Sequence, residues 1–286
     1  MKEIRKLILI ILLFYMLKSS YLYFFYYDSY FIQFLDVGQG DSIIVGSPGA
    51  GRLIIDGGGN WDLDMYLSGI QTLPFCKLDY IILTHAHVDH LIGLNRLMDR
   101  CRVRNIMFND ISYSSETFQD FKKKINESRN YEDTSAANIS NLVSGQTFKL
   151  GKLEFYVAWP DRSLLKNDIP GSGINKTSVV VLLDYGKFEV LFTGDLDGIL
   201  LEKATTEFLL KHIDGNLDVL KVPHHGSNDG RNFAFYKSLA PKYCVISVGH
   251  QNRYGHPHPD QFDDLKKLGC KILRTDENGT IEFKLK

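Results

Sequence analysis

Four side chains of the kinds that bind metal ions lie within six residues, directly after a mainly apolar run at residues 78–83. That run has the length and composition of a buried strand. It leads into Thr84-His85-Ala86-His87-Val88-Asp89-His90, whose potential ligands are His85, His87, Asp89 and His90. A strand end holds such groups rigidly and leaves an open side for solvent, as a metal site requires. The sequence therefore predicts a metal centre at the end of this strand.

The residue types in this cluster favour a reactive site over a structural one. Alternation on an extended chain places His85 and His87 on one side, and the turn into a following helix brings Asp89 and His90 to a second position. Imidazoles and a carboxylate suit zinc, manganese or iron. The four cysteines are far apart and lack Cys-x-x-Cys spacing. We therefore expect the cysteines to be buried small side chains, and neither a metal site nor a disulfide framework.

From residue 30 onward the chain alternates between short strands and helices, with no repeat and no linker. Strands are expected at residues 30–36, 42–46, 52–55, 78–83, 103–108, 147–150, 153–158, 178–183, 188–193, 217–222, 243–248, 271–274 and 280–284. Helices are expected at residues 89–99, 116–126, 199–210, 233–239 and 259–268. Such a pattern predicts an α/β fold in which two sheets lie between outer helices. Residues 30–286 are expected to form one catalytic domain.

The first 29 residues predict a membrane segment. Three basic residues precede an apolar run at residues 7–17, and residues 21–27 are again apolar and aromatic. This order is typical of a secretory signal, but no convincing small-x-small cleavage site follows it. We therefore expect residues 1–29 to be an uncleaved, single-pass anchor in the cell membrane, with the catalytic domain outside. A secreted protein, or a cytoplasmic one whose N-terminal helix packs on its own core, is the alternative.

The metal loop and three further motifs resemble the metallo-β-lactamase superfamily. His-x-His-x-Asp-His after a strand is that superfamily's signature. Asp56, in Ile55-Asp56-Gly57-Gly58, is similar to the aspartate that orients the histidine loop, and Asp195, in Thr193-Gly194-Asp195, to the one that bridges two metals. The segment at residues 220–227 is similar to the motif of a later ligand histidine. The resemblance implies an αββα sandwich that holds one or two divalent metal ions, zinc or manganese, on His85, His87, Asp89, His90, Asp195 and His225.

The sequence departs from the superfamily at its third motif. That motif normally supplies a histidine before the bridging aspartate, but no histidine lies between residues 91 and 211. The matching segment, residues 171–178, is polar instead. We therefore expect the metal position held by the first two histidines of the loop to bind its metal more weakly. Asn175 and Ser178 are assigned to substrate binding.

Two more loops are expected to face the substrate. Adjacent residues on extended backbone point in opposite directions, so one residue of the pair His224 and His225 should bind metal and the other face substrate. We favour His225 as the ligand and His224 as a catalytic neighbour, with His256 as a further catalytic residue. A turn held by His-Pro and tyrosine packing is the alternative for the last loop. The side chains assigned to substrate binding in these loops are Ser227, Asn252 and Tyr254.

A narrower resemblance is to the hydrolase domain of the ComEC family of DNA-uptake competence proteins. Residues 34–42, 224–227 and 252–257 carry it, and it covers roughly residues 30–286. ComEC proteins also have a multi-spanning channel domain, so a stand-alone hydrolase domain is expected here. Asp41, in the first of these motifs, either stabilises a glycine-rich turn or lies at the mouth of the site. Phosphorylcholine esterases that act on teichoic acid share several of the motifs.

The predicted function is a metal-dependent phosphodiesterase or nuclease that acts on DNA at the outer cell surface. Asp89 is expected to orient the attacking water while it helps to bind the second metal. The alternatives are a phosphoesterase for teichoic acid or a small phosphodiester, and a non-catalytic metal-binding module. The net charge of −1, from 33 basic and 34 acidic residues, neither supports nor excludes a basic groove for DNA. No protein partner can be inferred.

Overall fold

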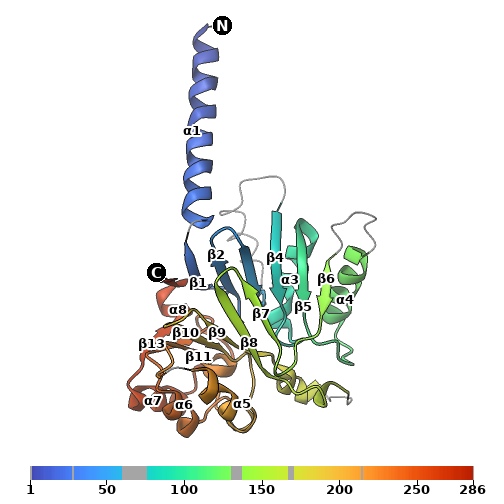
Figure 1. Ribbon diagram of the computed structural model, residues 1–286, viewed down its shortest axis with the longest axis vertical. Coiled ribbons are helices and arrows are strands. Elements are labelled where there is room, and N and C mark those ends of the chain that lie inside the picture. Colours follow the sequence, from blue (N-terminus) through green and yellow to red (C-terminus); the bar gives the residue numbers. More distant parts are fainter. Residues whose placement is uncertain are drawn as a thin grey trace.

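The computed structural model describes residues 2–27, 29–59, 76–129, 137–166, 171–213 and 215–285. Within these ranges two seven-stranded sheets lie face to face, with helices outside them (Figure 1). The first sheet has the order β14 (Ile281–Leu285), β1 (Tyr30–Phe34), β2 (Ile43–Ser47), β3 (Gly51–Ile55), β4 (Cys76–Ile82), β5 (Cys101–Met107) and β6 (Asn138–Ser140). The second has the order β13 (Lys271–Arg274), β12 (Tyr243–Ile246), β11 (Val219–Lys221), β10 (Glu189–Phe192), β9 (Val180–Asp184), β8 (Leu153–Trp159) and β7 (Thr147–Leu150). The predicted two-sheet sandwich is confirmed.

Both sheets combine an antiparallel part with a parallel part. In the first sheet β3, β4, β5 and β6 pair in parallel, and in the second β10, β11, β12 and β13 do so. The carboxyl ends of neighbouring parallel strands meet at one edge of a sheet, where α/β proteins usually bind ligands. The motifs singled out in the sequence follow β3, β4, β10, β11 and β12. The topology therefore gathers these motifs on one side of the molecule.

The apolar residues pack in three layers because the strands bury both faces. Along β9, Val181 and Leu183 point into the layer between the sheets, whereas Val180 and Leu182 point to the outer layer. The outer face of the first sheet is covered by α3 (Val88–Arg100) and α4 (Glu116–Arg129). The outer face of the second is covered by α5 (Gly198–His212), α6 (Phe233–Leu239) and α7 (Pro259–Leu268). The short elements that were not predicted are β6, α8 (Thr275–Asn278) and the 3₁₀ helices η1 (Leu164–Lys166), η2 (Gly171–Thr177) and η3 (Pro223–Gly226).

The N-terminal helix α1 (Lys2–Tyr27) projects away from both sheets (Figure 1). Its large apolar side chains between Ile4 and Leu17 are exposed. None of the helices within the described residues combines the length and the hydropathy that a membrane crossing requires. The membrane anchor therefore stays a prediction.

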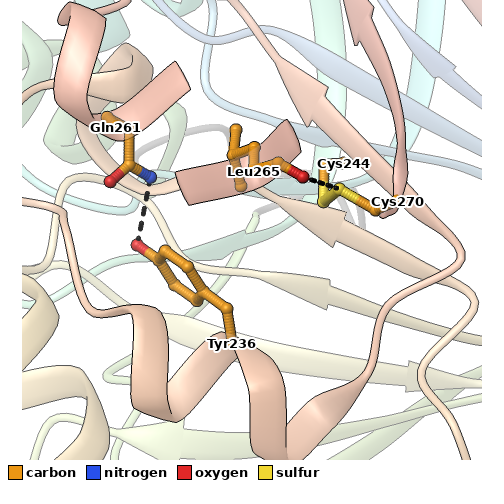
Figure 2. Close-up of a disulfide and its surroundings, with 5 residues drawn as sticks. All are labelled: Tyr236, Cys244, Gln261, Leu265 and Cys270. Atoms are coloured by element: carbon orange, nitrogen blue, oxygen red, sulfur yellow. Dashed lines mark hydrogen bonds between the residues drawn. A yellow bond between two sulfur atoms is a disulfide. The ribbon is translucent and has the colours of Figure 1, made fainter. Parts of the chain in front are cut away.

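Cys244 and Cys270 are buried as predicted, but the expectation that the cysteines form no disulfides is wrong. Cys244 in β12 and Cys270, just before β13, form a disulfide beneath α7 (Figure 2). Cys101 is disulfide-bonded as well, and no cysteine in the described part of the chain is free. Spacing could not reveal the Cys244–Cys270 bond, because pairing between parallel neighbours brings together residues that are 26 positions apart. The bond encloses residues 252–256, which carry one of the predicted substrate motifs.

Removing this bond should destabilise the domain. The double variant Cys244→Ala/Cys270→Ala should lower the free energy of unfolding by about 3 kcal/mol, because the unfolded chain regains the freedom of the opened loop. Urea denaturation followed by circular dichroism, with and without a chelator, measures the change apart from any metal contribution. An unchanged urea midpoint would show that the bond adds nothing to stability.

Candidate metal centre

The predicted metal loop lies where β4 passes into α3. His85 and His90 are buried, and Asp89 stands in the first turn of α3, where the helix dipole favours an anion. The helix comes unusually close to the loop after β3 because Gly57 and Gly93 lack side chains. A Cβ on Gly57 would lie 2.3 Å from a backbone nitrogen of α3, and its own N–H donates to the His90 carbonyl at 2.7 Å. This contact fixes the position of α3, and of the metal loop that precedes it, relative to the first sheet.

The second sheet supplies Asp195 and the histidine pair. Asp195 follows β10 and is buried, and His225 follows β11 with its Nδ1 2.9 Å from the Ser247 carbonyl. The prediction assumed an extended backbone at the histidine pair. Instead, both residues have left-handed backbones, with φ of 48° at His224 and 55° at His225. The reason given for their opposite directions was therefore wrong. Their environments still differ, since the side chain of His225 is 2% exposed and that of His224 22%.

Two groups of possible ligands share one carboxylate. The first consists of His85, His87 and Asp195, and the second of Asp89, His90, Asp195 and His225. The Asp195 Oδ2 atom lies 3.3 Å from His90 Nε2, 3.4 Å from His225 Nε2 and 3.8 Å from His85 Nε2. Asp89 Oδ2 lies 3.3 Å from His225 Nε2. A carboxylate shared in this way suits two metal ions, because an anion between two cations screens their repulsion.

Asp56 supports the metal loop from below. It has a left-handed φ of 57° and is fully buried. Its carboxylate accepts hydrogen bonds from the Thr84 N–H at 2.8 Å and from the Thr84 hydroxyl at 2.6 Å, and contacts His90 Nδ1 at 2.8 Å. A carboxylate on Nδ1 fixes the ring and leaves Nε2 for a metal. These are the contacts that the expected orienting role requires.

A buried ion pair joins the two halves of the centre. Lys221, the last residue of β11, has its Nζ 2.5 Å from Asp41 Oδ2, and both side chains are almost completely buried. The same Nζ donates to the Gly194 carbonyl at 3.1 Å, and Asp41 Oδ1 lies 3.4 Å from His225 Nδ1. Asp41 therefore lies beneath the site and not at its mouth. Lys221 was not predicted to have a role, because the sequence alone does not show that Asp41 is its ion-pair partner.

The electrostatics of the cluster favour cations. Burial, helped by the charge of His90, holds the pKa of His85 well below its ordinary value, so its ring is neutral as a metal ligand must be. Burial also lowers the pKa of His90 and His225, but Asp195 and other nearby carboxylates outweigh it and both pKa values lie well above the ordinary range. Burial raises the pKa of Asp195, yet the same two histidines bring it well below its usual value. The carboxylates thus stabilise positive charge at His90 and His225, and a metal ion bound there would take the place of these protons.

The donor atoms fit divalent metal ions. Among the described residues, three buried imidazole nitrogens that face Asp195 have no hydrogen-bond partner: His85 Nε2, His90 Nε2 and His225 Nε2. Buried polar atoms without partners are costly, and metal coordination would satisfy them. Imidazole nitrogen and carboxylate oxygen are the donors that zinc, manganese and iron accept.

The structure separates the predicted substrate residues into buried supports and exposed groups. Ser178 is buried, and its hydroxyl accepts from the Asp195 N–H at 3.1 Å. Ser227 is also buried, and its hydroxyl accepts from the Gly230 N–H. Asn252 uses its side chain within its own loop: the amide donates to two carbonyls, and Oδ1 accepts two backbone N–H groups. These three side chains shape the site, whereas Tyr254 is 53% exposed at its rim.

Asn175 offers a way to test the ligand-poor position. The group of His85, His87 and Asp195 contains three residues, one fewer than the other group. Asn175 has a buried Oδ1 that finds no hydrogen-bond partner within the described part of the chain, and it lies three residues before Ser178, which supports Asp195. Asn175→His should therefore raise the metal content of purified protein, measured by elemental analysis after dialysis. Two tightly held metals per chain in the unaltered protein would contradict the predicted deficit.

The comparisons with known proteins agree with this geometry. Residues 35–250 match the family described as "Metallo-beta-lactamase superfamily". The chain is 30% identical over 272 residues to ComE operon protein 3 of Bacillus subtilis, which covers 89% of this chain and 33% of the relative. It is 25% identical over 255 residues to Recombination protein 2 of Haemophilus influenzae, covering 87% of this chain and 28% of the relative. The chain thus spans about a third of the length of these relatives.

Solved structures share the fold at low sequence identity. The metallo-β-lactamase fold protein YhfI of Bacillus subtilis superposes with a TM-score of 0.57 at 15% identity, covering 90% of this chain and 100% of YhfI. CmlA of Streptomyces venezuelae, a diiron β-hydroxylase, gives a TM-score of 0.53 at 14% identity, covering 90% of this chain and 54% of CmlA. The fold alone therefore does not decide the reaction. With its matching motifs, its two-sheet sandwich and its shared Asp195, the chain belongs to the metallo-β-lactamase superfamily and is related to competence proteins.

Proposed function

We propose that the protein is a metal-dependent hydrolase that cuts phosphodiester bonds in DNA. The observation that carries this proposal is the pair of ligand groups that share Asp195. Two divalent metal ions bound there would activate water and neutralise charge on a phosphate group. The relation to competence proteins and to Recombination protein 2 supports DNA as the substrate, because DNA uptake and recombination both act on DNA.

The side chains around the ligand groups suggest a division of roles. Asp89 is 31% exposed, whereas the side chains of Asp195 and His225 are 2% exposed, so Asp89 is the carboxylate that water can reach. A carboxylate accepts hydrogen bonds from water and can orient it for attack. His224 Nε2 lies 3.8 Å from Asp195 Oδ2, and the ring centroids of His224 and His256 lie 5.8 Å apart. Burial, with the charges of His225 and His224, lowers the pKa of His256 to about 4, so it offers a neutral ring to the substrate.

We also propose that the domain works outside the cytoplasm, held at the membrane by α1. The disulfides support this, because disulfides persist mainly in oxidising compartments. The exposed apolar side chains of α1 would find cover in a lipid layer. Protease added to intact cells should degrade the domain, and the chain should stay with the membranes after a high-salt wash. Recovery of the intact protein from the cytosol would rule the proposal out.

One set of assays tests the proposed activity. The full chain in detergent, loaded with Mn²⁺ or Zn²⁺, should cut plasmid DNA and a nitrophenyl ester of a nucleotide, and a chelator should stop both reactions. Asp195→Ala, purified in the same way, is the matched control for a contaminating nuclease. Cleavage of p-nitrophenylphosphorylcholine alone would favour the teichoic acid alternative. Bound metal without hydrolysis of any of these substrates would favour a non-catalytic module.

A further inference from the structure

A cavity of about 420 Å³ opens beside Asp89 at the rim of the metal centre. The metal loop contributes Val88 and Asp89 to its wall, and the loop after β12 contributes Arg253 and Tyr254. Val88 is 48% exposed, which is unusual for an apolar side chain and leaves a small apolar surface facing solvent. Because Asp89 belongs to both the cavity and a ligand group, a molecule in this cavity would lie directly next to the metal centre.

Arg253 and Tyr254 form one exposed unit on this rim. The Arg253 guanidinium lies over the Tyr254 ring, 4.9 Å from its centroid, and Nη2 donates to the Tyr254 hydroxyl at 2.8 Å. The Tyr254 ring also stacks near His256, with centroids 5.7 Å apart and an angle of 25° between the planes. The Asn252 side chain binds four backbone groups of the same loop, and the Cys244–Cys270 disulfide encloses it. The unit is therefore held in place before any ligand arrives.

The charge of this unit distinguishes between the candidate substrates. An open tyrosine ring attracts a quaternary ammonium group such as choline. Here the ring already carries the Arg253 cation, which would repel a second cation. A nucleobase has no such charge and can stack on either a tyrosine ring or a guanidinium plane, while its neighbouring phosphates are attracted to the arginine.

We propose that Arg253 and Tyr254 form a nucleoside subsite, in which a base stacks on the pair and Arg253 contacts a phosphate next to the one that is cut. This inference rests on the proposed phosphodiesterase function and names the part of the substrate that the rim recognises. It makes these two residues specificity determinants that select nucleotides over choline esters.

Two substrates with the same leaving group test the subsite, thymidine 5′-(p-nitrophenyl phosphate) and p-nitrophenylphosphorylcholine. Any stacking of the nitrophenyl ring is common to both and cancels in the ratio of their kcat/KM values. In the metal-loaded full chain, Tyr254→Ala should lower the kcat/KM for the thymidine ester, relative to that for the choline ester, by about 10-fold. The change should come from a higher KM for the thymidine ester. Tyr254→Phe keeps the ring and should restore most of the preference. Arg253→Gln should lower KM for the choline ester, because the ring loses its cation.

Arg102→Gln is the matched control, since Arg102 is exposed near the start of β5, at the opposite end of the parallel strands from the metal loop. It should leave the ratio unchanged. An equal effect of Tyr254→Ala on both esters would overturn the proposal. Calorimetric binding of thymidine 5′-monophosphate distinguishes failure of the proposed subsite from failure of the proposed hydrolase function. If no ester is hydrolysed, the proposed function fails, but about 10-fold weaker binding to Tyr254→Ala would still support the subsite, and equal binding would end it.

Discussion

Asp89→Asn should leave most of the metal in place and lower turnover by about 10²–10⁴-fold, the range that is typical of a lost proton acceptor. An amide oxygen can still occupy a weak ligand position, but the amide cannot take a proton from water. Burial raises the pKa of Asp89, yet the hydrogen bond from His225 and the charges of His90 and His225 outweigh burial, and its pKa lies well below the usual range. The carboxylate is therefore anionic at any working pH. Elemental analysis beside single-turnover rates measures both quantities.

Asp195→Ala gives the contrasting result, because it removes the carboxylate that both ligand groups share. Metal content and turnover should fall together. His225→Ala should resemble Asp195→Ala, and His224→Ala should resemble Asp89→Asn, since only His225 belongs to a ligand group. If His224→Ala loses metal while His225→Ala keeps it, the two histidines exchange roles. Full activity in Asp89→Asn would require another group to handle the proton.

Lys221→Met should lower the free energy of unfolding by about 3–5 kcal/mol, the range for breaking a buried ion pair on one side. Methionine has a similar length but no charge, so Asp41 would be left buried without its cation. Asp41 also lies near His225 and His90, and its displacement would disturb the support of both ligands. Urea denaturation in the presence of a chelator measures the loss without a contribution from metal binding.

The double variant Asp41→Asn/Lys221→Met distinguishes charge from packing. If the uncompensated charge of Asp41 causes the loss, removing both charges should recover most of the stability. Lys211→Met is the matched control, because Lys211 pairs with Glu207 on the exposed side of α5. Its urea midpoint should not change, since exposed pairs contribute little. Equal destabilisation in the single and double variants would mean that the lysine stem matters and its charge does not.

Local patterns in the sequence were enough to predict most elements and the four ligand residues of the metal loop, and the family resemblance added Asp195 and His225. Strand and helix periods depend on neighbouring residues, so β4, α3 and the hairpin of β7 and β8 were placed within a few positions. The metal loop was visible because its four ligand types lie within six residues. The strand β6 was missed because it has three residues at a sheet edge and is largely polar and exposed, which leaves no apolar alternation to detect.

Only the tertiary structure decided which distant residues share the site. Asp195 meets His90 across 105 positions of sequence, and Lys221 meets Asp41 across 180, because each pair joins the end of a strand in one sheet to a loop of the other sheet. The disulfide between Cys244 and Cys270 arises from the pairing of adjacent parallel strands. The structure also assigns a different role to Asn252 than the sequence predicted. Asn252 was expected to bind substrate, but its side chain forms its hydrogen bonds within its own loop. Sequence determined which chemical groups are available, whereas the packing of the two sheets decided which of them meet, because contacts across the fold depend on strand order and not on spacing along the chain.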